Sequence, residues 1–313
     1  MNISYVSKLE VENTSSYCVM CINDGNILDL YNADKTQSVA SISKVMTAIV
    51  AIENGNLKEK VIVDAGIYEC EGSSLYLIEN DVYTLEDLIY GLMLRSGNDA
   101  AYVIAKHVFG SVDVFVEKMN EKAKSLKMYS TIFNNPSGLD EKDGGNISSS
   151  CDMAKLMQYA MQNEIFKKIT ATQTYKTKNN VWHNKNKFLK QYAYATGGKT
   201  GYTKKAGRTL ITTSKQNDME VVVVTLNKSD DFNFHTDMHT RMYELYDVVK
   251  IMKKGKYVFQ NKTIYIQNDI YQTIFKNNKK QIKIQSSLDS KYFTVLSSHA
   301  SFKKQYQFEV TYE

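Results

Sequence analysis

Proline, cysteine and long apolar runs are scarce in this 313-residue sequence, and each scarcity excludes something. It has one proline and no low-complexity tract, so long disordered linkers are not expected. No stretch reaches the ~18 apolar residues that a membrane-spanning helix needs. With 43% hydrophobic and 23% charged residues, the chain has the composition of a folded protein with one large core and room for a second, smaller domain.

The four cysteines do not form a metal-binding pattern. Cys18 and Cys21 make a C-x-x-C pair, but there is no second such pair to complete a zinc site. They lie in YCVMCI, which is typical of a β-strand, and residues three apart on a strand point to opposite faces. We therefore interpret all four cysteines as small, buried or half-buried residues.

Strong charge and targeting signals are also missing. The net charge of +5 comes mostly from scattered lysines; it could favour an anionic surface such as a cell wall or membrane but is too weak to indicate a nucleic-acid partner. The N-terminal stretch MNISYVSKLE lacks the basic-then-apolar pattern of a signal peptide. Composition alone fits a cytoplasmic protein or a mature form without its leader.

The apolar periodicity predicts a mixed α/β domain with a β-rich tail. A hairpin over residues 17–31 is expected at the Asp-Gly turn of NDGN. Strands are expected in GRTLITTSK and MEVVVVTLN, and short β-rich runs alternate with polar turns after residue 255. Helices are expected at about residues 41–54, 84–95 (with Thr84 as N-cap), 111–127, 150–163 and 237–253.

This change in composition predicts a domain boundary near Lys254. The expected domains are residues 1–254, which carry the helices and the main sheet, and residues 255–313, a small β-rich C-terminal domain.

A serine and a lysine three residues apart open the predicted helix in SVASISKVMTAIVA. Ser41 and Lys44 share one face of that helix. A lysine can activate a serine only when it is neutral, and burial or a second cation lowers its pKa from about 10.4. The apolar run VMTAIVA would bury Lys44, and Lys199 could supply the second cation. The alternative is that Ser41 merely begins a helix and Lys44 is a solvated charge.

Two further short motifs follow in order, Ser96-Gly97-Asn98 and Lys199-Thr200-Gly201. Each alone is weak, since the first could be a turn between helices and the second a glycine-rich loop. Together, S-x-x-K, S-x-N and K-T-G resemble the signatures of penicillin-binding proteins and serine β-lactamases. ASISKVMTAIVAIENG, LIYGLMLRSGNDAAYVIA, NNPSGLDEKDGGNISSSCDMAKLM and GGKTGYTKKAGRTLITTS resemble, in that order, segments of the low-molecular-mass D-alanyl-D-alanine carboxypeptidases, serine peptidase family S11.

The resemblance covers roughly residues 15–250 and implies a fold and an activity. The fold would be α/β (α+β), of the penicillin-binding-protein and β-lactamase-like transpeptidase type, with an antiparallel sheet flanked by helices and a small C-terminal all-β domain. The activity would be that of a serine-type D-Ala-D-Ala carboxypeptidase, which removes the terminal D-alanine of peptidoglycan pentapeptide stems and is acylated by β-lactams. No cofactor or metal is implied.

The resemblance also implies residue roles. Ser41 would be the nucleophile and Lys44 its base, and Ser96 would relay a proton to the leaving D-alanine. The substrate-binding residues would be Asn98, Lys199, Thr200, Gly201 and Tyr202. Asn98 would also hold Lys44 in place. The backbone amides of Tyr202 and Ser41 would form the oxyanion hole. An arginine after K-T-G often grips the substrate carboxylate in the family; Arg208 and Arg241 are candidates, and the sequence does not choose between them.

Two features depart from the family pattern, and three other classes of protein are alternatives to it. Ile42-Ser43 stands where the family usually has two small residues before the lysine, and Gly197-Gly198 stands where an aspartate often precedes K-T-G. A class A β-lactamase would have an E-x-x-L-N segment between Ser96 and Lys199, which we do not find. Esterases and glutaminases share only the first motif. A non-catalytic sensor of β-lactams or peptidoglycan would show damaged motifs, whereas all three are intact.

His235 and His239 lie four apart, a spacing that on a helix could hold a metal. No third ligand is apparent, so we interpret His239 as a structural hydrogen-bonding residue. The cell-wall substrate implies an extracytoplasmic location (secreted, at the cell wall or on the outer face of the membrane) with the signal peptide absent from this chain. Peripheral membrane or cell-wall association stays open, and roles in cell shape and peptidoglycan synthesis follow from the resemblance.

Overall fold

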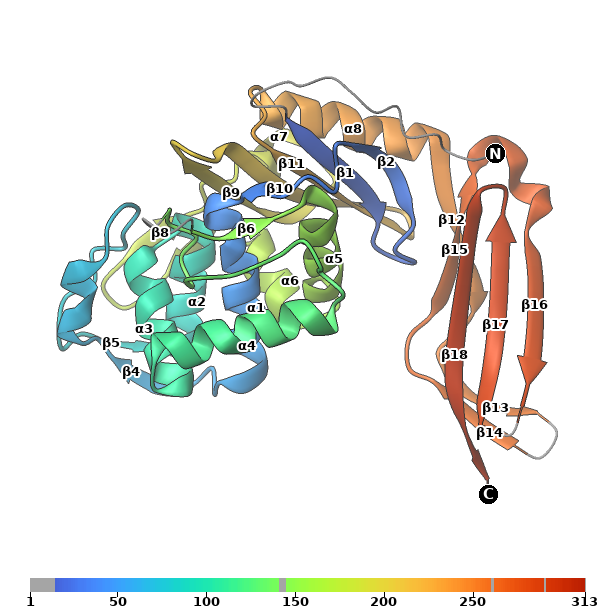
Figure 1. Cartoon of the computed structure of the whole chain (residues 1–313), viewed down its shortest axis with the longest axis horizontal. Helices are drawn as coiled ribbons and strands as arrows, with labels where there is room; N and C mark the ends of the chain where they lie inside the picture. The colour runs from blue at the N-terminus through green and yellow to red at the C-terminus, as the bar shows by residue number, and fades with distance from the viewer. Residues whose placement is uncertain (1–14, 141–144, 260–261, 290, 313) are drawn as a thin grey trace.

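The core of the molecule is a five-stranded antiparallel sheet. The computed structural model describes residues 15–140, 145–259, 262–289 and 291–312. The strand order is β2-β1-β11-β10-β9 (Figure 1), so the N-terminal hairpin lies beside strands from residues 195–226. These strands are β1 (Ser16–Cys21), β2 (Ile27–Tyr31), β9 (Ala195–Thr203), β10 (Gly207–Gln216) and β11 (Met219–Leu226).

The predicted N-terminal hairpin is confirmed. β1 and β2 pair antiparallel around a turn in which Gly25 has a φ of +72°. This left-handed conformation is the reason that the turn uses glycine. Asp24 stabilises the turn because its carboxylate accepts hydrogen bonds from the backbone and side-chain nitrogens of Asn26 at 3.1 and 2.8 Å.

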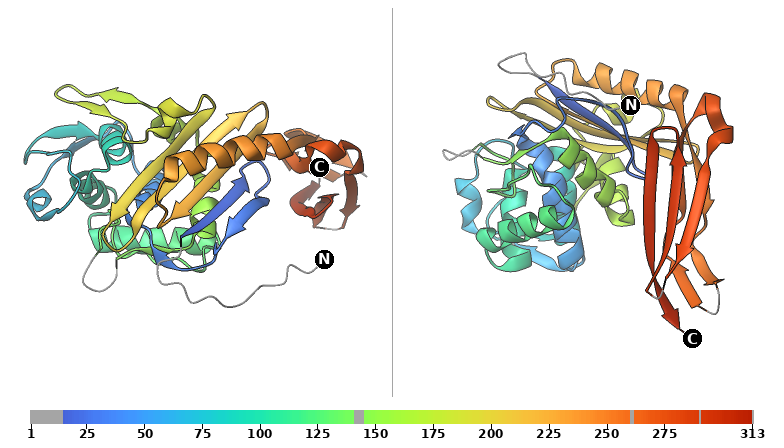
Figure 2. Two further views of the ribbon diagram at one scale, coloured as in Figure 1. Left: turned by 90° about the horizontal axis from the view of Figure 1, so that it is seen from above. Right: turned by 45° about the vertical axis from the view of Figure 1, so that its right-hand side comes forward.

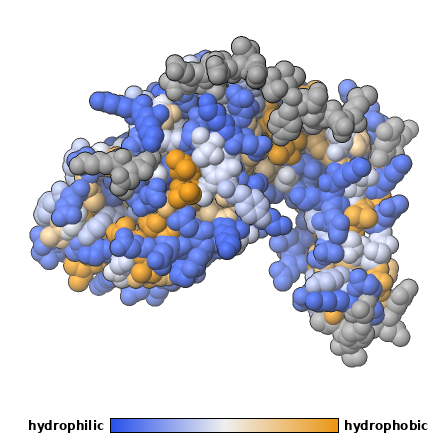
Figure 3. Space-filling view, viewed as in Figure 1, coloured by the Kyte–Doolittle hydropathy of each residue, from blue (hydrophilic) through white to orange (hydrophobic). Residues whose placement is uncertain are grey.

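The sheet separates two apolar cores. Along β1, Cys18 and Met20 face the larger core with the helices between residues 44 and 171, while Val19 and Cys21 face a smaller core against the helix of residues 231–245. The molecule therefore has three layers, with helices on both faces of the sheet (Figure 2). The face shown in Figure 3 is mostly hydrophilic, with small and separate hydrophobic patches.

Eight α-helices surround the sheet in the described part of the chain. The N-cap predicted at Thr84 is confirmed, and the structure adds a capping box, because Thr84 and Asp87 exchange hydrogen bonds at the start of α2. The helices are α1 (Lys44–Asn54), α2 (Leu85–Arg95), α3 (Asn98–Phe109), α4 (Val112–Ser125), α5 (Ser150–Ala160), α6 (Glu164–Ala171), α7 (Phe188–Gln191) and α8 (Asp231–Leu245).

Short two-stranded pairs tie the connecting loops together. They join β3 (Gln37–Ser38) to β6 (Ile147–Ser148), β4 (Lys60–Ile62) to β5 (Val82–Thr84), and β7 (Thr174–Lys176) to β8 (Val181–His183).

The helix predicted over residues 237–253 is wrong in its second half. α8 ends at Leu245, and β12 (Tyr246–Met252) follows directly. β12 pairs antiparallel with β15 (Ile270–Phe275), with Val248 opposite Thr273. The partner strand and the β-branched pair Val248-Val249 override a helical pattern that continues locally through this segment.

The C-terminal part is built from strands, as the sequence predicts. Strands β13 (Gly255–Phe259), β14 (Lys262–Ile266), β16 (Lys283–Leu288), β17 (Tyr292–His299) and β18 (Phe302–Tyr312) form a five-stranded sheet in the order β13-β14-β18-β17-β16. This sheet stands beside the turn of the N-terminal hairpin and the end of α8 (Figures 1 and 2). The domain boundary at residues 254/255 stays a prediction.

Asp24 also joins the two parts of the chain. Its carboxylate is buried and accepts hydrogen bonds from the backbone nitrogen of Thr273 at 2.6 Å and from the Thr273 hydroxyl at 2.7 and 2.9 Å. A hairpin turn of the main sheet is thereby fixed to β15.

Candidate active site

Ser41 lies in a tight turn immediately before the helix that carries Lys44. Residues Ala40–Ser43 form a 3₁₀ turn, and α1 begins at Lys44, so the predicted helix starts slightly later than expected. Ala40 has a φ of +49°, an uncommon conformation for a residue with a side chain. The chain thus bends sharply and leaves Ser41 half-buried at the wall of a cavity of about 400 Å³.

Lys44 is fully buried and points at Ser41. Its Nζ lies 3.1 Å from Ser41 Oγ and 2.7 Å from Asn98 Oδ1, and it also donates to the carbonyl of Ser137. The solvated-charge alternative for Lys44 is therefore excluded. Burial is the main reason that the pKa of Lys44 falls well below its usual range, and the positive charges of Lys199 and Lys185 add to this effect.

A second serine–lysine pair lies beside the first. Ser96, in a left-handed conformation (φ +66°) at the end of α2, accepts a hydrogen bond from Lys199 Nζ at 3.0 Å. Lys199 also donates to the carbonyl of Thr200 at 2.7 Å. Lys199 is almost completely buried, and burial, reinforced by the charge of Lys185, lowers its pKa to about 7. The three sequence motifs thus meet at one point in space.

Gly201 allows β9 to approach the turn that carries Ser41. A Cβ atom at Gly201 would lie 2.4 Å from Thr209 Oγ1 and 3.0 Å from the backbone nitrogen of Ser41. Thr209, on β10, donates a hydrogen bond to the carbonyl of Val39 at 3.1 Å. The edge of the sheet is therefore held against the turn without room for a side chain at residue 201. Tyr202 follows on the same strand with an exposed side chain.

The loop after Pro136 closes the other side of the Ser41–Lys44 pair. Besides the Ser137 carbonyl that binds Lys44, the carbonyl of Pro136 accepts a hydrogen bond from Thr47 at 2.6 Å. Gly138 has a φ of +79°, and a Cβ there would lie 2.0 Å from the carbonyl oxygen of Ala40. In the sequence, the NNPSGL segment carries a family resemblance without a residue role, and only the structure shows its contact with Lys44.

Asp99 is a buried residue that the sequence reasoning missed. Its carboxylate accepts hydrogen bonds from Ser74 Oγ at 2.6 Å and from the backbone nitrogens of Leu75 and Leu77 at 2.9–3.2 Å. It therefore fixes the loop that contains Ser73, which lines the cavity. Asp99 lies in the first turn of α3, and its place directly after Asn98 was the available signal.

Arg208, not Arg241, lies at the cavity. Arg208 lines the cavity together with Ser41 and Thr200, and its guanidinium pairs with the buried carboxylate of Asp231 at 2.7 and 3.1 Å. About half of the Arg208 side chain stays exposed. Arg241 is an exposed residue of α8 whose charge acts on Tyr17 and Tyr246, outside the cavity lining.

His235 and His239 are buried in a hydrogen-bonded row beneath the sheet. Thr212 Oγ1 lies 2.7 Å from His235 Nδ1 and 2.8 Å from His239 Nε2. The other ring nitrogens contact Thr225 Oγ1 at 2.9 Å and Ser214 Oγ at 2.7 Å. Hydroxyl groups thus occupy all four nitrogens, and the described residues contain no group of three or more potential metal-ligating side chains.

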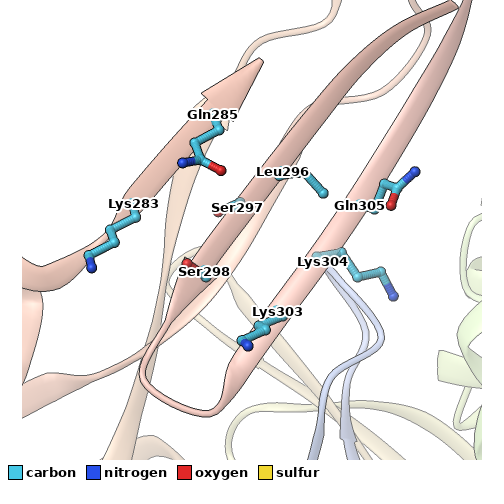
Figure 4. A pocket seen from close by; sticks show the side chains of 8 residues that line it. All are labelled: Lys283, Gln285, Leu296, Ser297, Ser298, Lys303, Lys304 and Gln305. Atoms are coloured by element: carbon cyan, nitrogen blue, oxygen red, sulfur yellow. The ribbon is translucent and has the colours of Figure 1, made fainter. Parts of the chain in front are cut away.

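A second cavity, of about 440 Å³, lies in the C-terminal sheet, far along the chain from these motifs. Lys283, Lys303 and Lys304 line it together with polar side chains of β16, β17 and β18 (Figure 4). Ser297 and Ser298 stand opposite Lys304 and Lys303 on the neighbouring strand there, but these lysines are exposed or half-buried, unlike Lys44 and Lys199. We therefore place the candidate active site at the first cavity.

Comparison with known proteins identifies the family. Residues 4–230 match the family model described as D-alanyl-D-alanine carboxypeptidase. The chain belongs to this family. The D-alanyl-D-alanine carboxypeptidase DacF of Bacillus subtilis is 33% identical over 215 residues, which cover 66% of this chain and 55% of that protein. A D-alanyl-D-alanine carboxypeptidase of Mycobacterium tuberculosis is also 33% identical and is covered to 74%.

Solved structures agree with this membership. A D-alanyl-D-alanine carboxypeptidase from Mycobacterium tuberculosis superposes with a TM-score of 0.70 at 30% identity, covering 74% of this chain and 90% of that one. Penicillin binding protein 5 from Haemophilus influenzae matches 98% of this chain and 99% of its own with a TM-score of 0.80; at 22% identity it shows the fold. The predicted family, enzyme class and fold, including a β-rich C-terminal part, are confirmed.

Carboxypeptidases of this family act on peptidoglycan, outside the cytoplasm. In the parts of the chain that the structure describes, none of the helices has both the length and the apolar character needed to cross a membrane.

Proposed function

We propose that this chain removes the terminal D-alanine from peptidoglycan pentapeptide stems through an acyl-enzyme on Ser41, and that β-lactams acylate the same serine. The observation that carries the proposal is the contact between Ser41 Oγ and the buried Lys44 Nζ, 3.1 Å apart, at a cavity that K-T-G residues line. The family membership supplies the substrate class.

Lys44 acts as the base in the proposed acylation. Burial and the charge of Lys199 favour its neutral form, which can accept the proton of Ser41 as the hydroxyl attacks the carbonyl carbon of the D-Ala-D-Ala bond. Asn98 and the Ser137 carbonyl orient the amine. Ser96 is near enough to Lys199 to return a proton to the leaving D-alanine.

The opposite wall of the cavity suits an anion. Thr200 and Arg208 line the cavity and offer it a hydroxyl and a positive charge, and Lys199 lies behind the lining residue Ser96. In our proposal these three residues bind the terminal carboxylate of the substrate. The backbone nitrogens of Ser41 and Tyr202 serve as the oxyanion hole. Support for this comes from Gly201, whose missing side chain lets β9 and the Ser41 turn approach each other. Water then hydrolyses the acyl-enzyme.

Ser41→Ala tests the proposal. We expect wild-type protein to bind a fluorescent penicillin covalently and to release D-alanine repeatedly from a peptide ending in D-Ala-D-Ala, whereas Ser41→Ala should do neither. Ser43→Ala, which removes a buried hydroxyl two residues away, is the control and should keep both activities within roughly tenfold.

Two results would overturn the proposal in different ways. Labelling of Ser41→Ala at the wild-type rate, measured by gel fluorescence and intact mass, would exclude Ser41 as the nucleophile. Labelling of the wild type without turnover of the peptide would instead make the chain a sensor.

Arg208→Leu should weaken recognition of the substrate carboxylate. We expect kcat/KM for the peptide to fall roughly 10- to 100-fold, because the charge-assisted contact between Arg208 and the terminal carboxylate of the peptide is lost. Arg241→Leu is the matched control, since that arginine is exposed elsewhere on α8. Equal values of kcat/KM for Arg208→Leu and wild type would remove Arg208 from the carboxylate site.

The finer aspects of location belong to this proposal as well. We infer an exported protein that acts at the cell wall or on the outer face of the membrane, with residues 1–254 as the catalytic domain and residues 255–313 as an accessory domain. Roles in cell shape and peripheral membrane association are consistent with the substrate. Fractionation of cells that express the natural gene product would test the location.

A further inference from the structure

Cys18 and Cys151 face each other between the sheet and a helix. Cys18 lies on β1 and Cys151 in the first turn of α5, and their sulfur atoms are 3.2 Å apart. The two residues are separated by 133 positions in the sequence, so only the fold brings them together. Both are buried, Cys18 completely and Cys151 with 5% of its surface exposed.

The other cysteines do not share this arrangement. Cys21 points to the opposite face of the sheet, into the core against α8, and its thiol contacts Asn23. Cys70 is half-buried and contacts the carbonyl of Gly66. The C-x-x-C spacing therefore does not make a pair, and the thiol next to Cys18 is that of Cys151.

The backbone holds this pair in place from both sides. The Cys151 nitrogen donates to the carbonyl of Ala33 at 3.1 Å, and β1 is hydrogen-bonded along its whole length to β11. A disulfide bond of about 2.05 Å is only about 1 Å shorter than the present separation of the sulfur atoms. The two sulfur atoms therefore have to approach each other by about 1 Å for the bond to form.

The two thiols also have different acidities. The hydrogen bond that Cys151 shares with Cys18 is the main cause that lowers the pKa of Cys151, and its place in the first turn of α5 also favours a thiolate. The same hydrogen bond, together with burial, raises the pKa of Cys18. Because Cys151 also keeps 5% of its surface exposed whereas Cys18 keeps none, Cys151 is the thiol that a small oxidant reaches first.

We propose that Cys18 and Cys151 are a thiol-oxidation site that forms a disulfide with a low-molecular-mass disulfide such as oxidised glutathione as the oxidant. The Cys151 thiolate attacks one sulfur of the oxidant and displaces one glutathione thiolate. Cys18, after losing its proton, then attacks Cys151 Sγ and displaces the second. Two protein thiols become one disulfide, one small disulfide becomes two thiols, and the two protons pass to the released glutathiones.

The bond would fasten β1 to α5 across the larger core. It would close a loop of more than 100 residues, so it restricts the unfolded chain strongly. We expect the melting temperature of the oxidised protein to exceed that of the reduced protein by roughly 5 °C or more.

Refolding in a glutathione redox buffer tests the proposal. The full chain is reduced, unfolded and refolded with reduced and oxidised glutathione, and then analysed by intact mass and by non-reducing peptide mapping. We expect a mass loss of about 2 Da from the two hydrogens and a linked peptide that contains Cys18 and Cys151. The double variant Cys21→Ala/Cys70→Ala, which keeps only this pair, should behave identically, whereas Cys151→Ala should keep its full mass.

The result that would overturn the proposal is equally direct. The proposal is contradicted if the refolded wild type has a native circular dichroism spectrum but retains four free thiols. It is also contradicted if the refolded protein links Cys18 to Cys21. Because these readouts need neither catalysis nor Ser41, their failure is separate from any failure of the proposed carboxypeptidase activity.

Discussion

Lys44→Met is expected to lower the rate of penicillin acylation by about 10³-fold or more. Methionine has a similar length and is apolar, so it fits the buried position. It has no amine to accept the proton of Ser41, whose Oγ lies 3.1 Å from Lys44 Nζ in the wild type. In the wild type, the acylation rate should rise with pH as Lys44 loses its proton, since only the neutral amine is a base. The measurement is stopped-flow acylation across pH.

Lys187→Met is the matched control for this variant. Lys187 is an exposed lysine that lines the same cavity, so its replacement should change the rate only a few-fold and leave the pH dependence in place. A folded Lys44→Met protein, checked by circular dichroism, with acylation within tenfold of wild type would show that Lys44 is not the base.

Acidification is expected to destabilise the protein steeply because of His235 and His239. Burial lowers the pKa of His239 to about 3 and that of His235 well below its usual value. Both rings are therefore neutral in the folded chain but take up protons in the unfolded chain below pH 6.5. Their stabilising contribution is complete above pH 6.5 and is lost as the pH falls below it.

The size of this effect follows from proton linkage. A ring that stays neutral in the folded chain contributes about 1.4 kcal/mol per pH unit, so His239 alone removes about 2.5 kcal/mol of unfolding free energy between pH 6.5 and 4.5. His235 adds to this loss in the same direction. The loss is a large fraction of the roughly 5–15 kcal/mol by which proteins are stable. Urea unfolding at several pH values measures it.

His239→Gln separates this pair from the other titrating groups. The variant should show roughly half of the histidine-dependent slope, because glutamine does not titrate. His183→Gln, at an exposed position, should keep the full wild-type slope. If unfolding free energy changed with pH to the same extent in all three proteins, the buried pair would not be the cause.

Much of the local structure and the family could be predicted from the sequence. The Asp-Gly turn, the Thr84 cap and the alternation of Cys18 and Cys21 across a strand depend on neighbours in the sequence. A turn and a cap depend on a few adjacent residues, and the alternation follows the two-residue period of a strand. These features can therefore be predicted from the sequence without knowledge of the tertiary structure. The order of the three motifs sufficed to indicate the family.

The end of α8 could not be predicted in the same way. The helical pattern continues past Leu245, and only the pairing of β12 with β15 turns residues 246–252 into a strand. The partner strand begins about 20 residues later in the chain, beyond the range of any local pattern.

The sequence by itself determined which residues belong to the three motifs and that Lys44 needed burial to act as a base. Only the tertiary structure decided what surrounds that lysine. The Ser137 carbonyl and Asn98 come from separate segments, and the choice of Arg208 over Arg241 follows from how β10 and α8 pack. The physical reason is that a pKa and a hydrogen bond depend on atoms a few ångströms away in space, whatever their separation along the chain.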